Sequence, residues 1–291
     1  MGSYPPPPDF PNQAPGPEVM PPGRDPYSLE QQEDLRAVRA RGGEPRSGSR
    51  SWAFAPATYF LIIINCVVFL GMFFSHVSMT HPTGDELLLW GANSPERVLH
   101  YGEWWRIVTA MFVHVGIIHL ATNMWCLWNL GLLGEPLLGP SGLIAAYILS
   151  GAAGNLLSVG VNQAMERGEI VGAGASGAVF GLAGLLIVLL KSPRLPIPAK
   201  ELSGLRRYVI YFALINFAIG FGTYVLNTSV QIDNMAHLGG CVGGMIFALP
   251  LVPLIGSPRD LFLIRRRFAV GLLTCVLVLF GFFLSNAVPI K

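Results

Sequence analysis

The stretch IVGAGASGAVFGLAGLLIVLL, residues 170–190, contains no charged residue and is long enough to cross a lipid bilayer, which takes about 20 apolar residues. It is one of seven uncharged stretches in a chain of 291 residues, and the charged residues gather in short islands between them. This pattern predicts an all-α membrane protein, a polytopic helical bundle with seven spans. The stretches cover approximately residues 54–74, 107–133, 137–165, 170–190, 208–232, 234–258 and 268–290.

The composition points to the same class of protein. Hydrophobic residues make up 52% of the chain and charged residues only 12%, whereas soluble domains carry about a quarter charged residues. This excludes a soluble globular enzyme and a secreted disulfide scaffold. The formal net charge of +2 also lacks the basic footprint that nucleic acid requires.

The chain divides into three expected parts. Residues 1–50 hold 11 of the 23 prolines and too few apolar residues to fold, which predicts a disordered tail. Residues 51–256 contain the first six stretches and form the expected helical core. Residues 257–291 supply a loop and an extra C-terminal transmembrane helix.

The distribution of Lys and Arg predicts the orientation of the spans. If the tail is cytoplasmic, it shares that side with residues 191–207 and 259–267, and these regions together carry 15 Lys and Arg against four on the other side. Positive residues favour the cytoplasmic side. We therefore expect a multi-pass protein of the cell membrane, with a cytoplasmic N-terminus and an extracellular or periplasmic C-terminus.

Two connections between the stretches are distinctive. Residues 75–106 mix Trp and Leu with charged residues, which is typical of a structure lying partly in the membrane interface. The segment GEPLLGP, residues 134–140, is expected to form a tight turn. With Glu135 in that turn, no acidic residue falls inside a predicted span.

Four polar side chains within the stretches need an explanation, because hydrocarbon makes polar groups costly. They are His119 and Asn123 in the second stretch, Ser176 in the fourth and His237 in the sixth. These three stretches run inward from the external side. If the second helix starts near Phe112, all four side chains fall at a similar depth in the outer half of the bilayer.

Their spacing favours a chemical role. His119 and Asn123 share one helix face, and small residues beside Ser176 and His237 allow two helices to approach closely. A hydroxyl and an imidazole brought together in this way form a nucleophile and its general base, with donors beside them for an oxyanion. The small residues are Gly174, Gly177, Gly240 and Gly244.

Each feature also has a purely structural interpretation. A single GxSG packs helices, a buried His binds a backbone carbonyl, and an HxxxN pair joins two helices. Their occurrence together, at one depth on three helices of the same direction, favours the site.

These residues resemble the motifs of the rhomboid family of intramembrane serine proteases. GASG at 174–177 is similar to the family's GxSG, AHLGGCVGG at 236–244 to its AHxxGxxxG, and HLATN at 119–123 to its HxxxN. Trp105-Arg106 is similar to the Trp-Arg of its first loop. The resemblance covers about residues 54–254, and an extra C-terminal helix occurs in part of the family.

The resemblance implies a role for each residue. Ser176 would be the nucleophile and His237 the general base and later the acid, a dyad without an acidic partner. His119, Asn123 and the Ser176 N–H would form the oxyanion hole. Phe180 occupies a position where some members carry a Tyr stacked on the catalytic His.

The resemblance further implies the partners, namely the bilayer and single-span membrane proteins cleaved near the outer face, with no cofactor, metal or nucleic acid. Substrates would enter between the second and fifth spans. One alternative is a non-catalytic rhomboid-like protein that binds membrane clients, although such proteins characteristically lack the Ser or the His. A small transporter is the other alternative, but the internal repeat that it predicts is not seen.

The remaining candidates have structural interpretations. Asp233, one turn before His237, is expected to be the N-cap of the sixth span. His114 is expected to pack or to bind the first loop. His76, His81 and His100 are expected to be solvated.

Overall fold

The structure of the chain is a computed structural model, and every regular element in the part that it describes is helical, which confirms the all-α class. One extended backbone pair, Asn93 with Gly172, occurs there outside the helices. The predicted tail, residues 1–50, lies outside the described part. The described residues are 54–192, 195, 198–226, 232–252 and 259–287. The helices are α2 (Pro56–Phe74), α3 (Gly84–Leu89), the π-helical turn η1 (Glu96–His100), α4 (Arg106–Thr109), α5 (Ile117–Leu138), α6 (Pro140–Ala164), α7 (Ser176–Leu189), α8 (Ala199–Val225), α9 (Asn234–Ala248) and α10 (Arg259–Ala287).

The longer helices correspond to the uncharged stretches. Within the described ranges, seven helices have 14 residues or more, and each falls on one of the seven stretches. Four of them, α2, α6, α8 and α10, are long and apolar enough to cross a membrane. The 14-residue α7 and the 15-residue α9 are shorter, and α7 rises only about 21 Å. The structure thus shows a polytopic helical membrane protein, whereas the count of seven spans stays a prediction.

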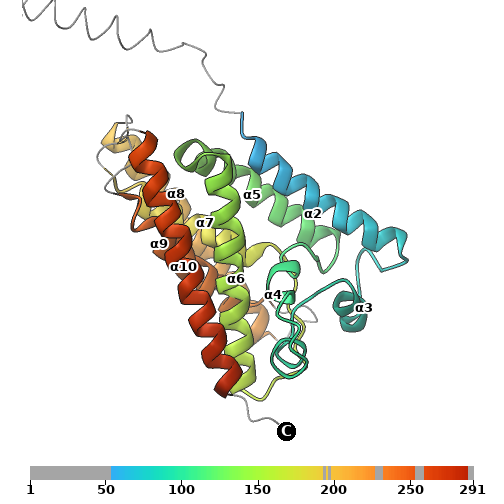
Figure 1. Ribbon diagram of the computed structural model, residues 1–291. Coiled ribbons are helices and arrows are strands. Elements are labelled where there is room, and N and C mark those ends of the chain that lie inside the picture. Colours follow the sequence, from blue (N-terminus) through green and yellow to red (C-terminus); the bar gives the residue numbers. More distant parts are fainter. Residues whose placement is uncertain (1–53, 193–194, 196–197, 227–231, 253–258, 288–291) are drawn as a thin grey trace, which may run out of the picture. The chain divides into compact units, whose positions relative to one another are not determined.

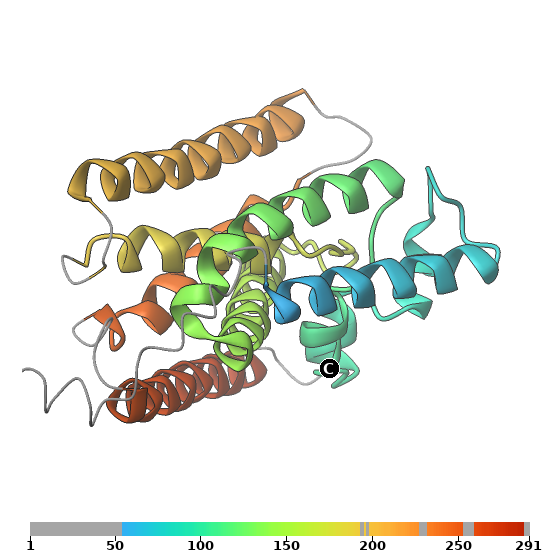
Figure 2. The same cartoon turned by 90° about the horizontal axis from the view of Figure 1, so that it is seen from above.

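The helices are arranged around α6, α7 and α9, which pack closely against one another (Figure 1). The first helix, α2, lies along α5. Seen from above, α8 and α10 lie on opposite sides of this centre, with α8 against α7 and α10 against α6 (Figure 2). Helix α8 is loosely attached, because only 17% of its apolar 18-residue segment is buried, compared with 50% for α6.

The contact between α7 and α9 is made by backbone rather than by side chains. A Cβ atom added at Gly240 would collide with the carbonyl oxygen of Gly177, and one at Gly244 would collide with that of Gly181. Only glycine permits this approach, since membrane helices gain their packing by bringing small residues together. The two helices are therefore held in one register by pairs of glycines.

The second predicted span begins later than expected. The sequence placed its start near Phe112, but α5 begins at Ile117. Gly116 has a φ of +99°, a conformation that L-residues rarely adopt and that ends any helix preceding it. The Ile117 N–H donates to the carbonyl of Met79 at 2.8 Å. The first loop, residues 75–116 between α2 and α5, thus supplies a hydrogen-bond acceptor for the start of α5.

The prediction of a tight turn over residues 134–140 is wrong. Helix α5 continues to Leu138 with Pro136 inside it, and α6 begins at Pro140, so Gly139 alone separates them. A φ of +73° at Gly139 makes this sharp reversal possible.

Glu135 consequently lies inside α5, which corrects the expectation that no acidic residue falls within a predicted span. Its buried carboxylate accepts hydrogen bonds from the N–H groups of Ala57 and Thr58 at 2.9 and 2.8 Å and from the Thr58 hydroxyl at 2.8 Å. The first N–H groups of a helix have no partner within it. Glu135 therefore caps α2 from a different helix.

Helices α8 and α10 each begin about nine residues before their uncharged stretches, within segments predicted to be loops. Charged residues end the apolar stretch but do not end a helix, because Lys, Arg and Glu are good helix formers. One of these charges, Arg266, donates from Nη1 to the Leu138 carbonyl at 2.9 Å. This bond fastens the start of α10 to the junction of α5 and α6.

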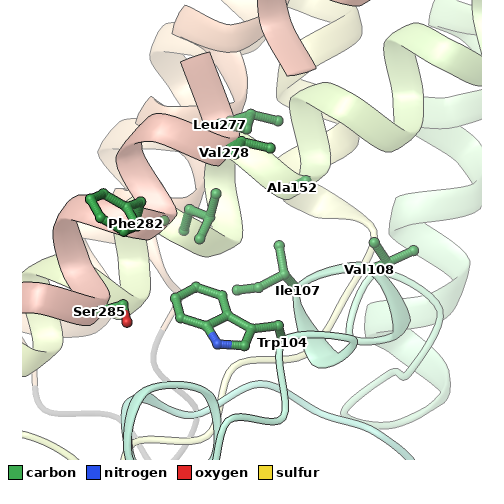
Figure 3. Close-up of a pocket in the computed structure, with 10 residues that line it drawn as sticks. Trp104, Ile107, Val108, Ala152, Leu277, Val278, Phe282 and Ser285 are labelled. Atoms are coloured by element: carbon green, nitrogen blue, oxygen red, sulfur yellow. The ribbon is translucent and has the colours of Figure 1, made fainter. Parts of the chain in front are cut away.

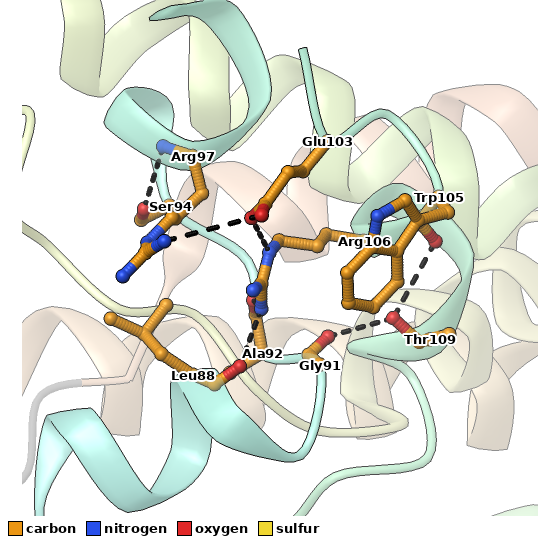
Figure 4. Close-up of polar contacts among 9 residues, drawn as sticks. All are labelled: Leu88, Gly91, Ala92, Ser94, Arg97, Glu103, Trp105, Arg106 and Thr109. Atoms are coloured by element: carbon orange, nitrogen blue, oxygen red, sulfur yellow. Dashed lines mark hydrogen bonds and ion pairs between the residues drawn. The ribbon is translucent and has the colours of Figure 1, made fainter. Parts of the chain in front are cut away.

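The first loop is a folded structure built around the guanidinium of Arg106, which is only 5% exposed (Figure 4). Its Nη1 donates to the carbonyls of Leu88 and Ala92 at 2.6 and 2.9 Å, and its Nε donates to Glu103 at 2.5 Å. The group also lies over the ring of Trp105, 4.4 Å from its centre. Arg106 thus ties together three segments of the loop.

An apolar groove of about 390 Å³ separates the first loop from the C-terminal half of α10 (Figure 3). Trp104 and Ile107 form its loop side, and Ala152 of α6 forms its floor. Along α10 it runs from Leu277 to Ser285. The groove makes α10 a neighbour of the first loop as well as of α6.

The glycine contact between α7 and α9 predicts a large effect of a single side chain. Gly244→Val should lower the free energy of unfolding by about 2–3 kcal/mol or more, because the rigid carbonyl of Gly181 cannot move aside. Gly271→Val on α10 is the matched control, since a Cβ there meets nothing within 4 Å. Unfolding of both variants in the same detergent micelles measures the difference. Equal stabilities would show that the backbone contact does not limit packing.

Candidate active site

Ser176 is the first residue of α7, and the segment before it is shaped by Gly174. That glycine has a φ of +133° and donates its N–H to the Ala110 carbonyl at 2.9 Å. A Cβ at Gly174 would lie 2.6 Å from the imidazole of His119, so the ring packs directly on the glycine. The backbone thus brings His119 of α5 next to the start of α7.

The N-terminus of α7 has no side-chain cap, because Ala175 precedes Ser176. The first N–H groups of this helix are therefore available to a ligand. A helix N-terminus carries a partial positive charge and favours anions. The backbone N–H of Ser176 lies at this end of the helix.

His237 lies one turn into α9, and its side chain is buried. Its imidazole is stacked on the ring of Phe180 at 4.0 Å between centres and 10° between planes. Phe217 of α8 meets the imidazole edge-on at 5.9 Å. Since Phe180 lies four residues after Ser176 on the same helix face, this aromatic ring links the serine helix to the histidine.

Backbone contacts also bring the two motifs together. A Cβ at Gly177 would lie 3.4 Å from the carbonyl of Ala236, so the residues following Ser176 and preceding His237 are neighbours. Both ring nitrogens of His237 are buried without a hydrogen-bond partner among the described residues. The dyad hydrogen bond is therefore not formed here. Such bonds are often long without substrate and shorten in the reacting complex.

The two candidate oxyanion donors both lie in the first two turns of α5. Asn123 is buried and donates one amide hydrogen to the carbonyl of His119 at 2.9 Å. The Nδ1 atom of His119 is buried without a partner in the described part of the chain. Ser176, His119 and His237 therefore lie near the starts of three helices, and the common depth of these three and Asn123 in the bilayer stays a prediction.

His114 has a role that the sequence analysis missed. It is fully buried, its Nδ1 lies 3.3 Å from the Phe112 carbonyl, and its Nε2 accepts from the Ala175 N–H at 3.4 Å. A carbonyl only accepts, so Nδ1 carries the proton and Nε2 is left as the acceptor. Its ring also contacts that of His119 edge-on at 5.4 Å. His114 therefore supports the residue before Ser176.

The remaining histidines and Asp233 follow the expectations. His76, His81 and His100 are exposed, as expected. The predicted N-cap is confirmed, because the Asp233 carboxylate accepts from the N–H groups of Met235 and Ala236. No group of three or more His, Cys, Asp or Glu that would hold a metal occurs among the described residues.

Comparison with known proteins identifies the arrangement. A family model described as the Rhomboid domain matches residues 101–254, more than half of the chain. The chain belongs to the rhomboid family. This confirms the family predicted from the motifs, and intramembrane proteolysis is the activity of this family's enzymes, although the family also contains non-catalytic members.

Several relatives of this rhomboid protein carry names that describe an activity. It is 31% identical to Rhomboid protease GluP of Bacillus subtilis (strain 168) over 222 residues, 76% of this chain and 38% of that protein. Rhomboid protease AarA of Providencia stuartii is 27% identical over 77% of this chain and 83% of that protein. RHOMBOID-like protein 7 of Arabidopsis thaliana is 29% identical over 63% and 56%. The chain thus spans less than two thirds of two of these three relatives.

The support given by His114 predicts a measurable loss. His114→Ala leaves the Ala175 N–H buried without its acceptor, which should lower the free energy of unfolding by about 1–3 kcal/mol. Thermal unfolding in detergent measures this loss, with His100→Ala as the exposed control. A His114 variant as stable as the control would contradict the assigned bond.

Proposed function

We propose that this rhomboid protein is an intramembrane serine endopeptidase that uses a dyad of Ser176 and His237. The observation that carries the proposal is the stack of His237 on Phe180, one turn after Ser176, between two helices in backbone contact. Family membership and the relatives named as proteases support it.

The reaction follows from the chemistry of the two side chains. The Ser176 hydroxyl attacks the carbonyl carbon of the scissile peptide bond while His237 accepts its proton. His237 then donates this proton to the leaving amine, and a water molecule hydrolyses the acyl-enzyme with the same assistance. The buried stack on Phe180 restricts the imidazole although no carboxylate is bonded to it.

The developing oxyanion would be stabilised at the start of α7. The Ser176 N–H belongs to a helix N-terminus without a side-chain cap, and His119 lies against Gly174 beside it. Asn123 still has one amide hydrogen to donate, because the other is used within α5. Together these donors form the proposed oxyanion hole.

The proposed substrates are single-span membrane proteins that are cleaved near the outer face of the bilayer. Helix α8 is the least buried of the four long apolar helices and contacts His237 through Phe217. This loose attachment supports entry of a substrate between α5 and α8. The proposed orientation places the N-terminus in the cytoplasm and the C-terminus outside the cell.

A non-catalytic rhomboid-like protein that binds membrane clients is the alternative. It needs the same helical core but no activated serine, so a fluorophosphonate probe separates the two functions. We expect the probe to label the detergent-solubilised protein and to leave Ser176→Ala unlabelled, because an activated hydroxyl is required. Equal labelling of both proteins, or of neither, would favour the client-binding function.

The roles of the two motifs predict different losses of activity. His237→Ala should abolish cleavage of a reconstituted single-span substrate, since no other base lies in the stack. Asn123→Ala should reduce the cleavage rate only partly, because one oxyanion donor contributes about 3–4 kcal/mol or less. Cleavage by His237→Ala at the unmutated rate would remove the dyad from the proposal.

A further inference from the structure

The imidazole of His237 is held without hydrogen bonds of its own. Neither ring nitrogen has a partner among the described residues, so its position depends on the stack with Phe180 and on where α9 begins. The N–H of His237 donates to the Asp233 carbonyl at 3.1 Å. The start of α9 therefore sets the height at which the imidazole meets Phe180.

Asp233 uses both oxygens of its carboxylate. Oδ1 accepts from the N–H groups of Met235 and Ala236 at 3.0 and 2.9 Å, which is an ordinary N-cap. Oδ2 accepts a short hydrogen bond from the hydroxyl of Ser158 on α6. The Ser158 oxygen in turn accepts from Asn162 at 3.2 Å. A cap alone would need only the first oxygen.

The bond between Ser158 and Asp233 crosses the interface of α6 and α9, where glycines bring the two helices into close contact. Helices α6 and α9 meet through backbone, because a Cβ at Gly239 would lie 2.7 Å from the Ala153 carbonyl, and one at Gly154 would meet the Ala236 carbonyl at 2.5 Å. The hydrogen bond from Ser158 to Asp233 adds a directional link to this packing at the start of α9. Ser158 is 4% exposed, so water does not compete effectively for its bond.

We propose that Asp233, through its bond to Ser158, is a positioning residue for His237. The bond fixes the axial position of α9 against α6 and thereby places the imidazole over Phe180 and beside Ser176. This inference rests on the proposed function, in which His237 is the general base. In this proposal Ser158 and Asp233 act through the histidine and not by contact with the substrate.

Three variants separate positioning from capping. Ser158→Ala removes the bond between the helices and leaves the cap. Asp233→Ser keeps a good N-cap but has a single oxygen, which cannot serve the cap and Ser158 together. The double variant completes a cycle. Ser150→Ala is the matched control, because this buried serine on the same helix donates only to the Ala146 carbonyl of α6.

We expect both single variants to lower kcat for a reconstituted single-span substrate about tenfold or more, with KM changed less than about twofold, because small misplacements of catalytic groups carry losses of this size. The double variant should lose no more than either single one. The control should retain kcat within about twofold. Losses confined to the melting temperature, or losses that multiply in the double variant, would overturn the inference.

A spectroscopic measurement tests the positioning of His237 independently of the proposed function. With isotopically labelled histidine, Ser158→Ala and Asp233→Ser should each shift the imidazole NMR signals of His237, whereas Ser150→Ala should leave them in place. If the unmutated protein neither cleaves nor takes the fluorophosphonate probe, the proposed function fails and these signals still report the position of the ring. Unchanged signals in both variants would refute positioning.

Discussion

The whole site depends on how closely α7 and α9 approach. Glycine pairs allow the two backbones to touch, and this distance lets Phe180 of one helix stack on His237 of the other. In a membrane, apolar surface gains little from association, so contact of this kind must come from packing at short range. A single Cβ at the contact would separate the two motifs, which explains why the same short segments supply both the packing and the chemistry.

The second constraint is the polar content of the core. Burial of a polar group is costly unless it has a partner, and several polar groups here are satisfied by side chains or carbonyls of other segments. Arg106 satisfies carbonyls of the first loop, His114 accepts from the N–H before Ser176, and Asp233 caps the helix of His237. The start of α7 has no side-chain cap, since Ala175 precedes Ser176. The proposed reaction would use the N–H groups at this uncapped helix start to bind the oxyanion.

The sequence predicted the helical class and the family correctly, because charge-free stretches and spaced motifs are local patterns, and the site residues read from the same motifs stay a prediction. It misplaced several helix ends for reasons that are not local. Hydropathy marks where charges begin, but α8 and α10 continue through Lys and Arg. Gly116 ends one segment by its backbone conformation, which a single sequence does not reveal. The partners of Glu135 and His114 lie 77 and 61 residues away, so no spacing rule would have found them.

The carboxylate of Glu135 also has a consequence for biogenesis. Helix α2 is synthesised and enters the lipid well before α5, yet the N–H groups of Ala57 and Thr58 receive their acceptor only from α5. In the proposed orientation, the cytoplasmic end of α2 therefore lacks this acceptor until α5 has been inserted. Insertion of α2 and completion of its cap are thus two separate events, and the second depends on α5.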